Sequence, residues 1–294
     1  MRPPHLCRSW LFVDGANETA LLQVAPTSKA DVLIQELEDF TPPPLRPKAR
    51  ELAPEVFGTW RAAGYVVGVR VNALDGDGMD DLTAVLRGAP NVVGLPKVAE
   101  PEHVVRLDAE ITRLERAYGL PEGSTAIWPN IELARGLVQT VAIARASQRV
   151  RACLMASEDL AADLGAERGP DGLELAYARQ RFLVDCVAAG VLAVDCPFTW
   201  RDDAGVERDA RWARRLGYKA KCTVASEHAA IINAVLTPNA GEVARARTIV
   251  TTFEAARARG ESRVTVHGSM IEVPIYHNMR RLLARAEELA AAER

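Results

Sequence analysis

The chain has 294 residues, of which 48% are hydrophobic and 26% are charged, and its formal net charge at pH 7 is −3. This length suffices for one large domain or two smaller ones. Because the charges are nearly balanced, the composition argues against a nucleic-acid-binding protein, which would need a clustered basic excess. Since no eighteen apolar residues follow one another, we expect no membrane-spanning helix and no membrane partner.

The cysteines and the first residues bear on the cellular compartment. The five cysteines are widely spaced, form no C-x-x-C pair and in several cases lie inside apolar runs. They predict buried free thiols in a reducing compartment. The opening MRPPHLCRSWLFVDG holds only a four-residue apolar run, which is too short for a signal peptide. We therefore expect a cytoplasmic protein.

Short β-type runs alternate with longer helical stretches along the first 235 residues. Helical segments such as 102–119 and 174–190 carry apolar residues at spacings of three and four, as amphipathic helices do. Eight strands separated by helices predict a parallel (β/α)₈ TIM barrel over residues 1–235, with an open doubly wound sheet as the less favoured alternative. The predicted strands cover residues 9–14, 31–38, 65–72, 91–98, 125–132, 150–157, 191–199 and 218–225.

The pattern changes after residue 235. A helix is predicted to begin at Thr237-Pro238 and to end at Gly260. A short extended piece with a turn at Gly268 and a final helix follow. Residues 236–294 are too few for a second domain. We expect a C-terminal helical extension that packs on the barrel or on a neighbouring subunit.

Polar residues collect where the predicted strands end, which in a barrel is the rim that carries active sites. Glu132 and Asp159 end the fifth and sixth predicted strands, so we expect them to lie near each other. Two carboxylates can hold one Mg²⁺ ion whose remaining positions go to water and substrate oxygens. Pairing of Glu132 with Arg135 is the structural alternative.

Arg70 stands in VGVRVN among apolar residues, where a guanidinium needs an anionic partner. Its planar fork suits a carboxylate or an enolate. A structural ion pair with Glu38 or Asp39 is a compatible second role. Lys97 is a weaker candidate for a Schiff base, because a metal pair makes an imine mechanism unnecessary.

Eight segments taken in order carry a resemblance to a known family: RSWLFVDG, LIQELEDFTPP, VRVNALD, GLPKV, NIELARG, ASEDLAADLG, ELAYARQR and GSMIEVPI. From about residue 8 to about residue 285, the chain resembles the citrate lyase β-subunit-like family of the HpcH/HpaI aldolase group. The resemblance implies a (β/α)₈ barrel with a C-terminal extension. It also implies Mg²⁺-dependent making or breaking of a carbon–carbon bond in malyl-, citramalyl- or citryl-CoA-like thioesters, with a 2-oxo acid as the other partner.

Carried over by position, the resemblance gives roles to individual residues. It implies that Glu132 and Asp159 are the magnesium ligands and that Arg70 binds the substrate and stabilises developing negative charge. Glu38 and Asp39 correspond to an acidic pair that supports the arginine and the metal's waters.

Two further roles and one departure follow from the same resemblance. The backbone at Ala156 and Ser157 would hold the carboxylate of a 2-oxo acid. In several family members the catalytic base is an aspartate in a G-x-M-I-D motif, which a neighbouring subunit supplies. This chain reads GSMIE at that place, so Glu272 is the candidate base. The alternative is that Glu272 only pairs with an arginine. Residues 221–228 read KCTVASEH instead of the family's K-x-C-I-H-P-x-Q, so we expect the pocket around the metal ligands to differ from that of family members.

The resemblance further suggests a homotrimer or a multiple of three. Three other functions stay open beside the CoA-dependent lyase. They are a thioesterase acting on a malyl-CoA-like substrate, an aldolase acting on free 2-oxo acids, and a non-catalytic barrel.

Overall fold

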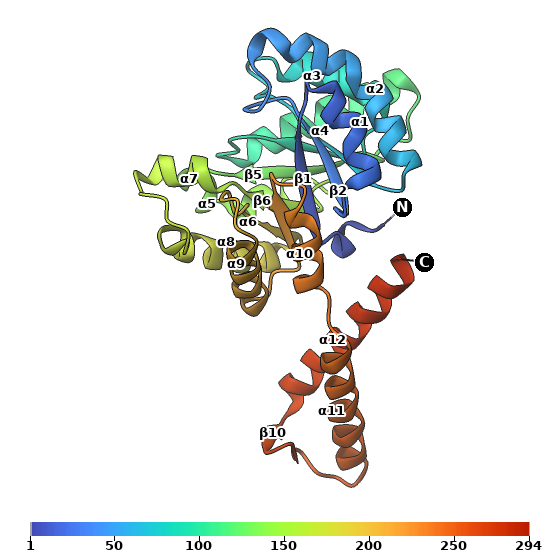
Figure 1. Cartoon of the computed structure of the whole chain (residues 1–294), viewed down its shortest axis with the longest axis vertical. Coiled ribbons are helices and arrows are strands. Elements are labelled where there is room, and N and C mark those ends of the chain that lie inside the picture. Colours follow the sequence, from blue (N-terminus) through green and yellow to red (C-terminus); the bar gives the residue numbers. More distant parts are fainter. Residues whose placement is uncertain (1, 294) are drawn as a thin grey trace. The chain divides into compact units, whose positions relative to one another are not determined.

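A computed structural model of the chain, which describes residues 2–293, contains a closed barrel of eight parallel strands in sequence order (Figure 1). Each strand pairs with the next, and β1 pairs with β8 to close the barrel. The predicted (β/α)₈ architecture is confirmed, and the open sheet is wrong. The strands are β1 (Ser9–Asp14), β2 (Val32–Glu36), β3 (Val66–Arg70), β4 (Val92–Leu95), β5 (Ala126–Ile131), β6 (Ala152–Met155), β7 (Leu192–Asp195) and β8 (Ala220–Thr223).

Helices connect the strands. Helix α4 illustrates why they start and stop where they do: Pro101 occupies its first position, and Gly119 ends it with a left-handed φ of 67°. The α-helices of the barrel are α1 (Glu18–Thr27), α2 (Arg46–Ala62), α3 (Gly78–Val85), α4 (Pro101–Tyr118), α5 (Ala134–Leu137), α6 (Thr140–Arg145), α7 (Ser157–Leu164), α8 (Ala176–Ala189), α9 (Asp203–Leu216) and α10 (His228–Leu236). Short 3₁₀ turns cover Pro4–Leu6, Pro43–Leu45, Leu86–Gly88 and Leu173–Leu175.

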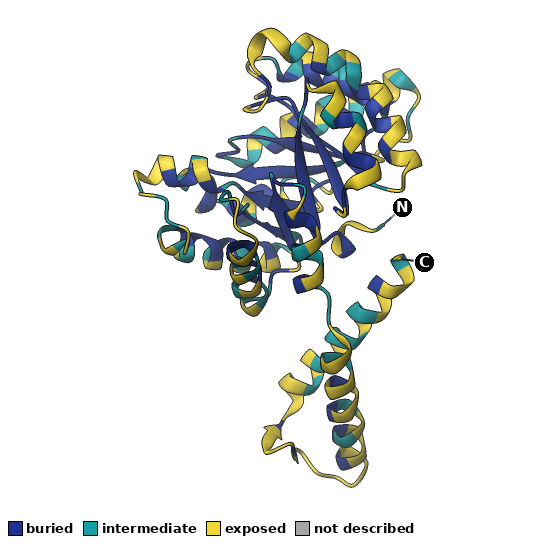
Figure 2. Cartoon of the chain, viewed as in Figure 1, coloured by how far each residue is buried: buried dark blue, intermediate teal, exposed yellow. Residues whose placement is uncertain are grey.

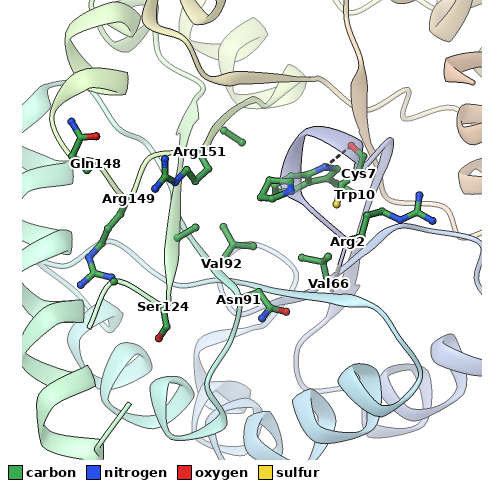
Figure 3. A pocket seen from close by; sticks show the side chains of 14 residues that line it. Arg2, Cys7, Trp10, Val66, Asn91, Val92, Ser124, Gln148, Arg149 and Arg151 are labelled. Atoms are coloured by element: carbon green, nitrogen blue, oxygen red, sulfur yellow. Dashed lines mark hydrogen bonds between the residues drawn. The ribbon is translucent and has the colours of Figure 1, made fainter. Parts of the chain in front are cut away.

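The barrel strands are buried on both faces (Figure 2), which explains their nearly continuous apolar sequences. Trp10 and Trp128 meet edge to face inside the barrel, with ring centroids 5.6 Å apart. Gly94 makes room for Trp128, since a Cβ at this position would lie 2.2 Å from the Trp128 ring. A cavity of about 320 Å³ lies next to Trp10 at the amino-terminal end of the strands (Figure 3), and no predicted site residue lines it.

Several strands are shorter than predicted, because polar residues at their carboxyl ends turn the chain out of the sheet. After β2, the Glu36 carboxylate accepts a hydrogen bond from the Glu38 backbone N–H at 2.6 Å. After β4, Lys97 adopts a left-handed φ of 52°, which no extended strand contains. Glu38 and Lys97 therefore lie in loops rather than in the predicted strands, and Asp39 lies in the same loop as Glu38.

The chain divides after Leu236 into two compact units. The second contains α11 (Ala240–Ala258), the hairpin β9 (Val264–Val266) and β10 (Ser269–Ile271), and α12 (Val273–Ala292). Helix α11 begins with a capping box formed by Asn239 and Glu242, so the predicted start at Thr237-Pro238 is wrong. That this unit packs on the barrel or on a neighbouring subunit stays a prediction.

All five cysteines are buried and unbridged, as predicted. Across residues 2–293, the structure has no helix with both the length and the apolar character that crossing a bilayer requires.

Candidate active site at the carboxyl end of the barrel

A cavity of about 460 Å³ opens at the carboxyl ends of the barrel strands. It is lined by five of the eight predicted site residues: Asp39, Arg70, Ala156, Ser157 and Asp159. Its other lining residues are Phe12, Phe40, Leu154, Glu158, Pro197, Thr199, Cys222 and Val224. The structure therefore brings most of the predicted site to one place, at the end of the barrel where this fold carries its active sites.

Arg70, the last residue of β3, is 5% exposed and is fixed mainly by Glu36. Its guanidinium donates hydrogen bonds to Glu36 Oε2 from both Nε, at 3.1 Å, and Nη2. Glu38 Oε2 lies 3.2 Å from Nη2. Burial alone would lower the pKa of Arg70, but Glu36 and its acidic neighbours raise it well above its ordinary value. Arg70 is thus a permanent positive charge in the cavity wall.

Glu36 is the principal partner of Arg70, and sequence reasoning missed it. Glu38 and Asp39 were expected instead, and they are secondary contacts. Glu36 and Arg70 are direct neighbours in the β2–β3 register, and residues at matching positions of adjacent parallel strands share one face of the sheet. The alternation of side chains along 32–36 and 66–70, compared between the two strands, was the signal that could have found the pair.

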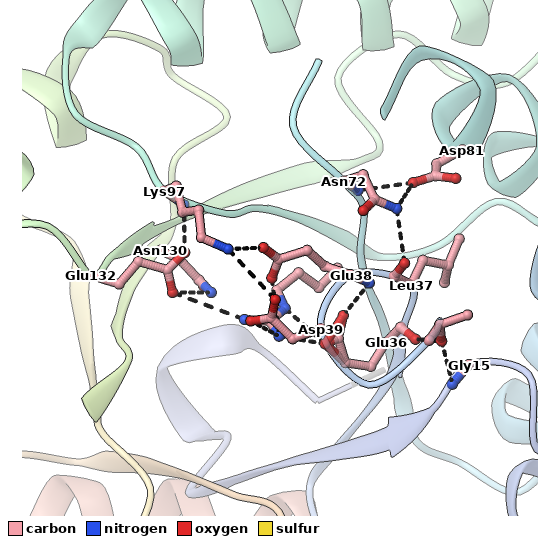
Figure 4. A network of polar contacts seen from close by, with 12 residues as sticks. Gly15, Glu36, Leu37, Glu38, Asp39, Asn72, Asp81, Lys97, Asn130 and Glu132 are labelled. Atoms are coloured by element: carbon pink, nitrogen blue, oxygen red, sulfur yellow. Dashed lines mark hydrogen bonds and ion pairs between the residues drawn. The ribbon is translucent and has the colours of Figure 1, made fainter. Parts of the chain in front are cut away.

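Lys97 links Glu38 and Asp39 on one side to Glu132 on the other in a network of polar contacts (Figure 4). Its Nζ donates a hydrogen bond to Glu38 and lies 3.6 Å from Asp39, while its backbone N–H donates to Glu132 Oε1 at 2.5 Å. Burial alone would lower the pKa of Lys97, but the hydrogen bond to Glu38 and the negative charges of Glu38, Asp39 and Glu132 together hold the pKa above its ordinary value. A protonated amine is a poor nucleophile, so the Schiff-base role is disfavoured.

Glu132 follows the last residue of β5 and is fully buried. Besides Lys97, its carboxylate accepts a long hydrogen bond from Asn130 Nδ2 at 3.4 Å, and Arg70 Nη1 lies 3.9 Å away. The alternative pairing with Arg135 is wrong, because the Arg135 guanidinium bonds to Glu100 at 2.6 Å. Burial raises the pKa of Glu132 to about 7, with a contribution from Asp159 and against the opposing effect of Arg70.

Asp159 lies in the first turn of α7, rather than at the end of a strand as predicted. It lines the cavity and is close enough to Glu132 to raise the pKa of that carboxyl. The adjacent Glu158 is engaged elsewhere: it accepts hydrogen bonds from Arg168 Nε at 3.2 Å and from Thr199 Oγ1 at 2.9 Å. Of the two adjacent carboxylates, Asp159 is therefore the one available to a ligand.

The start of α7 also supplies an anion-binding element. Ala156 is its N-cap residue, and Ser157 begins the helix at the edge of the cavity. The first backbone N–H groups of a helix have no partner within the helix, and the positive end of the helix dipole attracts anions. The amides that follow Ala156 therefore suit a small carboxylate.

The donor set of this cavity fits a hard divalent cation. Five carboxylates lie among two cations, Arg70 and Lys97, and Glu38 Oε2 is buried 3.2 Å from Arg70 Nη2 but accepts no hydrogen bond from the described residues. Within residues 2–293, no three acidic, histidine or cysteine side chains form a complete ligand cluster. A metal would thus take two protein carboxylates and complete its shell with water and substrate, as Mg²⁺ commonly does. The carboxylates are Glu36, Glu38, Asp39, Glu132 and Asp159.

Glu272 is not part of the barrel unit. It is the N-cap residue of α12 in the second unit, is exposed, and makes no capping hydrogen bond with its side chain within the described part of the chain. Its predicted role as a base stays a prediction.

The sequence profile of the HpcH/HpaI aldolase/citrate lyase family matches residues 8–225. The citrate lyase subunit beta of Escherichia coli is 34% identical over 282 residues, which cover 95% of this chain and 93% of the relative. The chain belongs to this family. The resemblance drawn from the sequence motifs is thereby confirmed.

A further relative and a solved structure extend the comparison. The L-malyl-CoA/beta-methylmalyl-CoA lyase of Cereibacter sphaeroides is 29% identical over 310 residues. The aligned region covers 98% of this chain and 96% of the relative. A crystal structure of CitE from Mycobacterium tuberculosis in complex with magnesium, acetoacetate and coenzyme A matches with a TM-score of 0.77 and 25% identity. That match covers 96% of this chain and 99% of the other.

Proposed function

We propose that this protein is a Mg²⁺-dependent carbon–carbon lyase that cleaves, or in reverse forms, a 3-hydroxyacyl-CoA of the malyl-, citramalyl- or citryl-CoA type. One observation carries the proposal: Arg70 and Asp159 line one cavity at the carboxyl ends of the strands, and the buried Glu132 carboxylate lies 3.9 Å from Arg70 Nη1. Relatives named as citrate lyase and malyl-CoA lyase, and a magnesium complex of a structural neighbour, support it.

Each residue has a defined task in this reaction. Mg²⁺ held by Glu132 and Asp159 would supply Lewis acidity to the carbonyl group of the 2-oxo acid. Arg70, oriented by Glu36, stabilises the negative charge that develops as the carbon–carbon bond breaks. The amides at the start of α7, next to Ala156 and Ser157, bind the carboxylate of the 2-oxo acid.

The cleavage direction needs a base. The base takes the proton of the substrate hydroxyl, and the O–H electron pair becomes the new C=O bond of the oxo acid. The electron pair of the broken carbon–carbon bond moves into the enolate of the acyl-CoA, which is then protonated. We assign this base to Glu272 of a neighbouring copy in a homotrimer or a multiple of three.

Glu272→Gln is expected to leave Mg²⁺-dependent binding of the 2-oxo acid intact and to lower kcat by about 10²–10⁴-fold, the usual contribution of a general base. Glu287→Gln, an exposed change on the same unit, serves as the control. If Glu272 of one copy acts in the cavity of another, mixed oligomers of the Arg70→Gln and Glu272→Gln variants should regain part of the activity. Some of their cavities then combine a native Arg70 with a native Glu272. A Glu272→Gln variant with wild-type kcat would contradict the assignment.

Product identification tests the reaction class. We expect incubation with malyl-CoA or citramalyl-CoA and Mg²⁺ to give acetyl-CoA and a 2-oxo acid, detected by mass spectrometry. Free CoA with an intact hydroxy acid would instead establish a thioesterase. Condensation of free acids without CoA would establish an aldolase of that kind.

The raised pKa of Glu132 predicts a pH dependence of metal binding. In the metal-free protein this carboxyl is half protonated at a pH of about 7, and a metal ligand must be deprotonated. Affinity for Mg²⁺ should therefore rise about tenfold per pH unit up to about 7 and then level off. Calorimetry of Mg²⁺ binding at pH 6 in buffers of different ionisation heat should show proton release, and this release should disappear above about pH 8, where Glu132 is already deprotonated. An affinity for Mg²⁺ that stays constant between about pH 5.5 and about pH 7 would contradict this prediction.

A further inference from the structure

Every second residue at the carboxyl end of β5 points into the barrel. Trp128 belongs to the apolar cluster inside the barrel, whereas Ile127 and Ile131 belong to the cluster that packs the strands against the helices. Because side chains alternate along a strand, Asn130 lies on the same inner face as Trp128, and Glu132 continues this spacing just past the strand. The three inward residues form a column from the apolar interior to the carboxylate proposed to bind metal.

Hydrogen bonds connect this column from end to end. The indole Nε1–H of Trp128 donates to Asn130 Oδ1 at 2.8 Å. Asn130 Nδ2 in turn donates to Glu132 Oε2 at 3.4 Å (Figure 4). All three side chains are fully buried, and buried polar groups depend on partners of this kind.

The indole of Trp128 decides which way the Asn130 amide faces. An indole N–H can only donate, and an ionised carboxylate can only accept. The amide between them must therefore turn its oxygen to Trp128 and its NH₂ group to Glu132. The indole ring cannot move aside, because it packs edge to face on Trp10 at a centroid distance of 5.6 Å and a Cβ at Gly94 would already lie 2.2 Å from it.

We propose that Asn130 and Trp128 are positioning residues for the metal ligand Glu132. This assignment rests on the proposed function, in which Glu132 and Asp159 hold Mg²⁺. The Lys97 backbone N–H binds Glu132 Oε1 at 2.5 Å and Asn130 binds Oε2, so the two bonds together orient the carboxylate before a metal binds. Trp128 acts through Asn130: its N–H fixes the amide and polarises it, which strengthens the bond that the amide donates. Groups that orient a metal ligand in this way typically contribute about 10–100-fold to metal affinity.

Asn130→Leu tests the assignment, because it keeps a side chain of similar size and removes both hydrogen bonds. In calorimetry with Mg²⁺ and pyruvate at pH 8, we expect the Mg²⁺-dependent affinity for pyruvate to fall about 10–100-fold. Val92→Ala removes two methyl groups from the same interior cluster at the start of β4. This control for a loosened core should leave the affinity within about twofold of wild type.

The outcomes separate this assignment from the proposed function. An affinity that is unchanged in Asn130→Leu would overturn the positioning role and leave the lyase proposal standing. Absence of Mg²⁺-dependent binding in the wild type would overturn the proposed function and the positioning role with it.

Trp128→Phe removes the indole N–H and tests whether Trp128 acts through Asn130. We expect the affinity to fall about threefold or more in an otherwise native chain. In the Asn130→Leu background the same change should have an effect of less than about twofold, because the amide on which the indole acts is already gone. Equal losses in both backgrounds would show that Trp128 acts by packing alone and would overturn its part.

The indole N–H signal in ¹⁵N nuclear magnetic resonance gives a readout that a purely structural role would not move. The signal of Trp128 is identified by its absence in Trp128→Phe. Trp128 is not among the residues found to line the cavity, yet binding of Mg²⁺ with pyruvate should shift its signal in the wild type. The shift should be much smaller in Asn130→Leu. A signal that stays in place in the wild type would contradict the connection, whether or not Asn130→Leu folds.

Discussion

Asp159→Asn is expected to abolish Mg²⁺-dependent binding of 2-oxo acids and to lower kcat/KM by at least about 10³-fold. The change keeps the size of the side chain and removes one of only two carboxylates proposed to hold the metal. Binding of pyruvate, glyoxylate and oxaloacetate in the presence and absence of Mg²⁺, followed by calorimetry, measures the effect directly. Unchanged Mg²⁺-dependent binding would refute the ligand assignment.

The same variant should not damage the fold. Asp159 raises the pKa of the buried Glu132 carboxyl, so its neutralisation removes a repulsion and should lower that pKa. The free energy of unfolding of the metal-free protein should therefore stay the same or increase slightly near pH 7. Glu167→Gln, an exposed change shortly after the same helix, controls for a general effect of losing one negative charge.

Lys221→Met is expected to lower the free energy of unfolding by about 3–5 kcal/mol, because it breaks a buried ionic network on one side only. Lys221 lies on β8 and is fully buried. Its Nζ is 2.8 Å from Asp195 Oδ2 and 2.5 Å from Asp209 Oδ2. Arg179 of α8 pairs with the same two aspartates at 2.6 and 2.7 Å. Removing Lys221 leaves the buried Asp195 and the partly buried Asp209 to share Arg179 as their one cation.

Urea denaturation measures this change in the free energy of unfolding, and two further variants serve as comparisons. Lys29→Met alters an exposed lysine and should change the free energy of unfolding by less than about 0.5 kcal/mol. The double variant Lys221→Met/Asp209→Leu removes one charge of each sign and should recover part of the lost stability, since breaking a pair costs more than replacing it. A loss below about 1 kcal/mol in Lys221→Met would show that the network contributes little.

Much of this architecture was predictable because it depends on local patterns. Apolar runs bounded by helical segments gave all eight strands, and the polar residues at their carboxyl ends predicted a rim that includes Arg70 and Glu132. Parallel strands bring their ends to one side of a sheet whatever their register. For this reason the rim could be predicted before any contact was known.

The remaining features depend on register and on backbone geometry, which act over long distances in the sequence. Only the β2–β3 register places Glu36 against Arg70. Only the left-handed backbone of Lys97 aims its N–H at Glu132. Similarly, Phe12 of β1 and Cys222 of β8 line one cavity because these two strands adjoin only when the barrel closes. The sequence by itself thus determined the barrel and the chemical groups at its rim, whereas the tertiary structure decided which of those groups meet, because pairing across strands is not encoded in the spacing along any one of them.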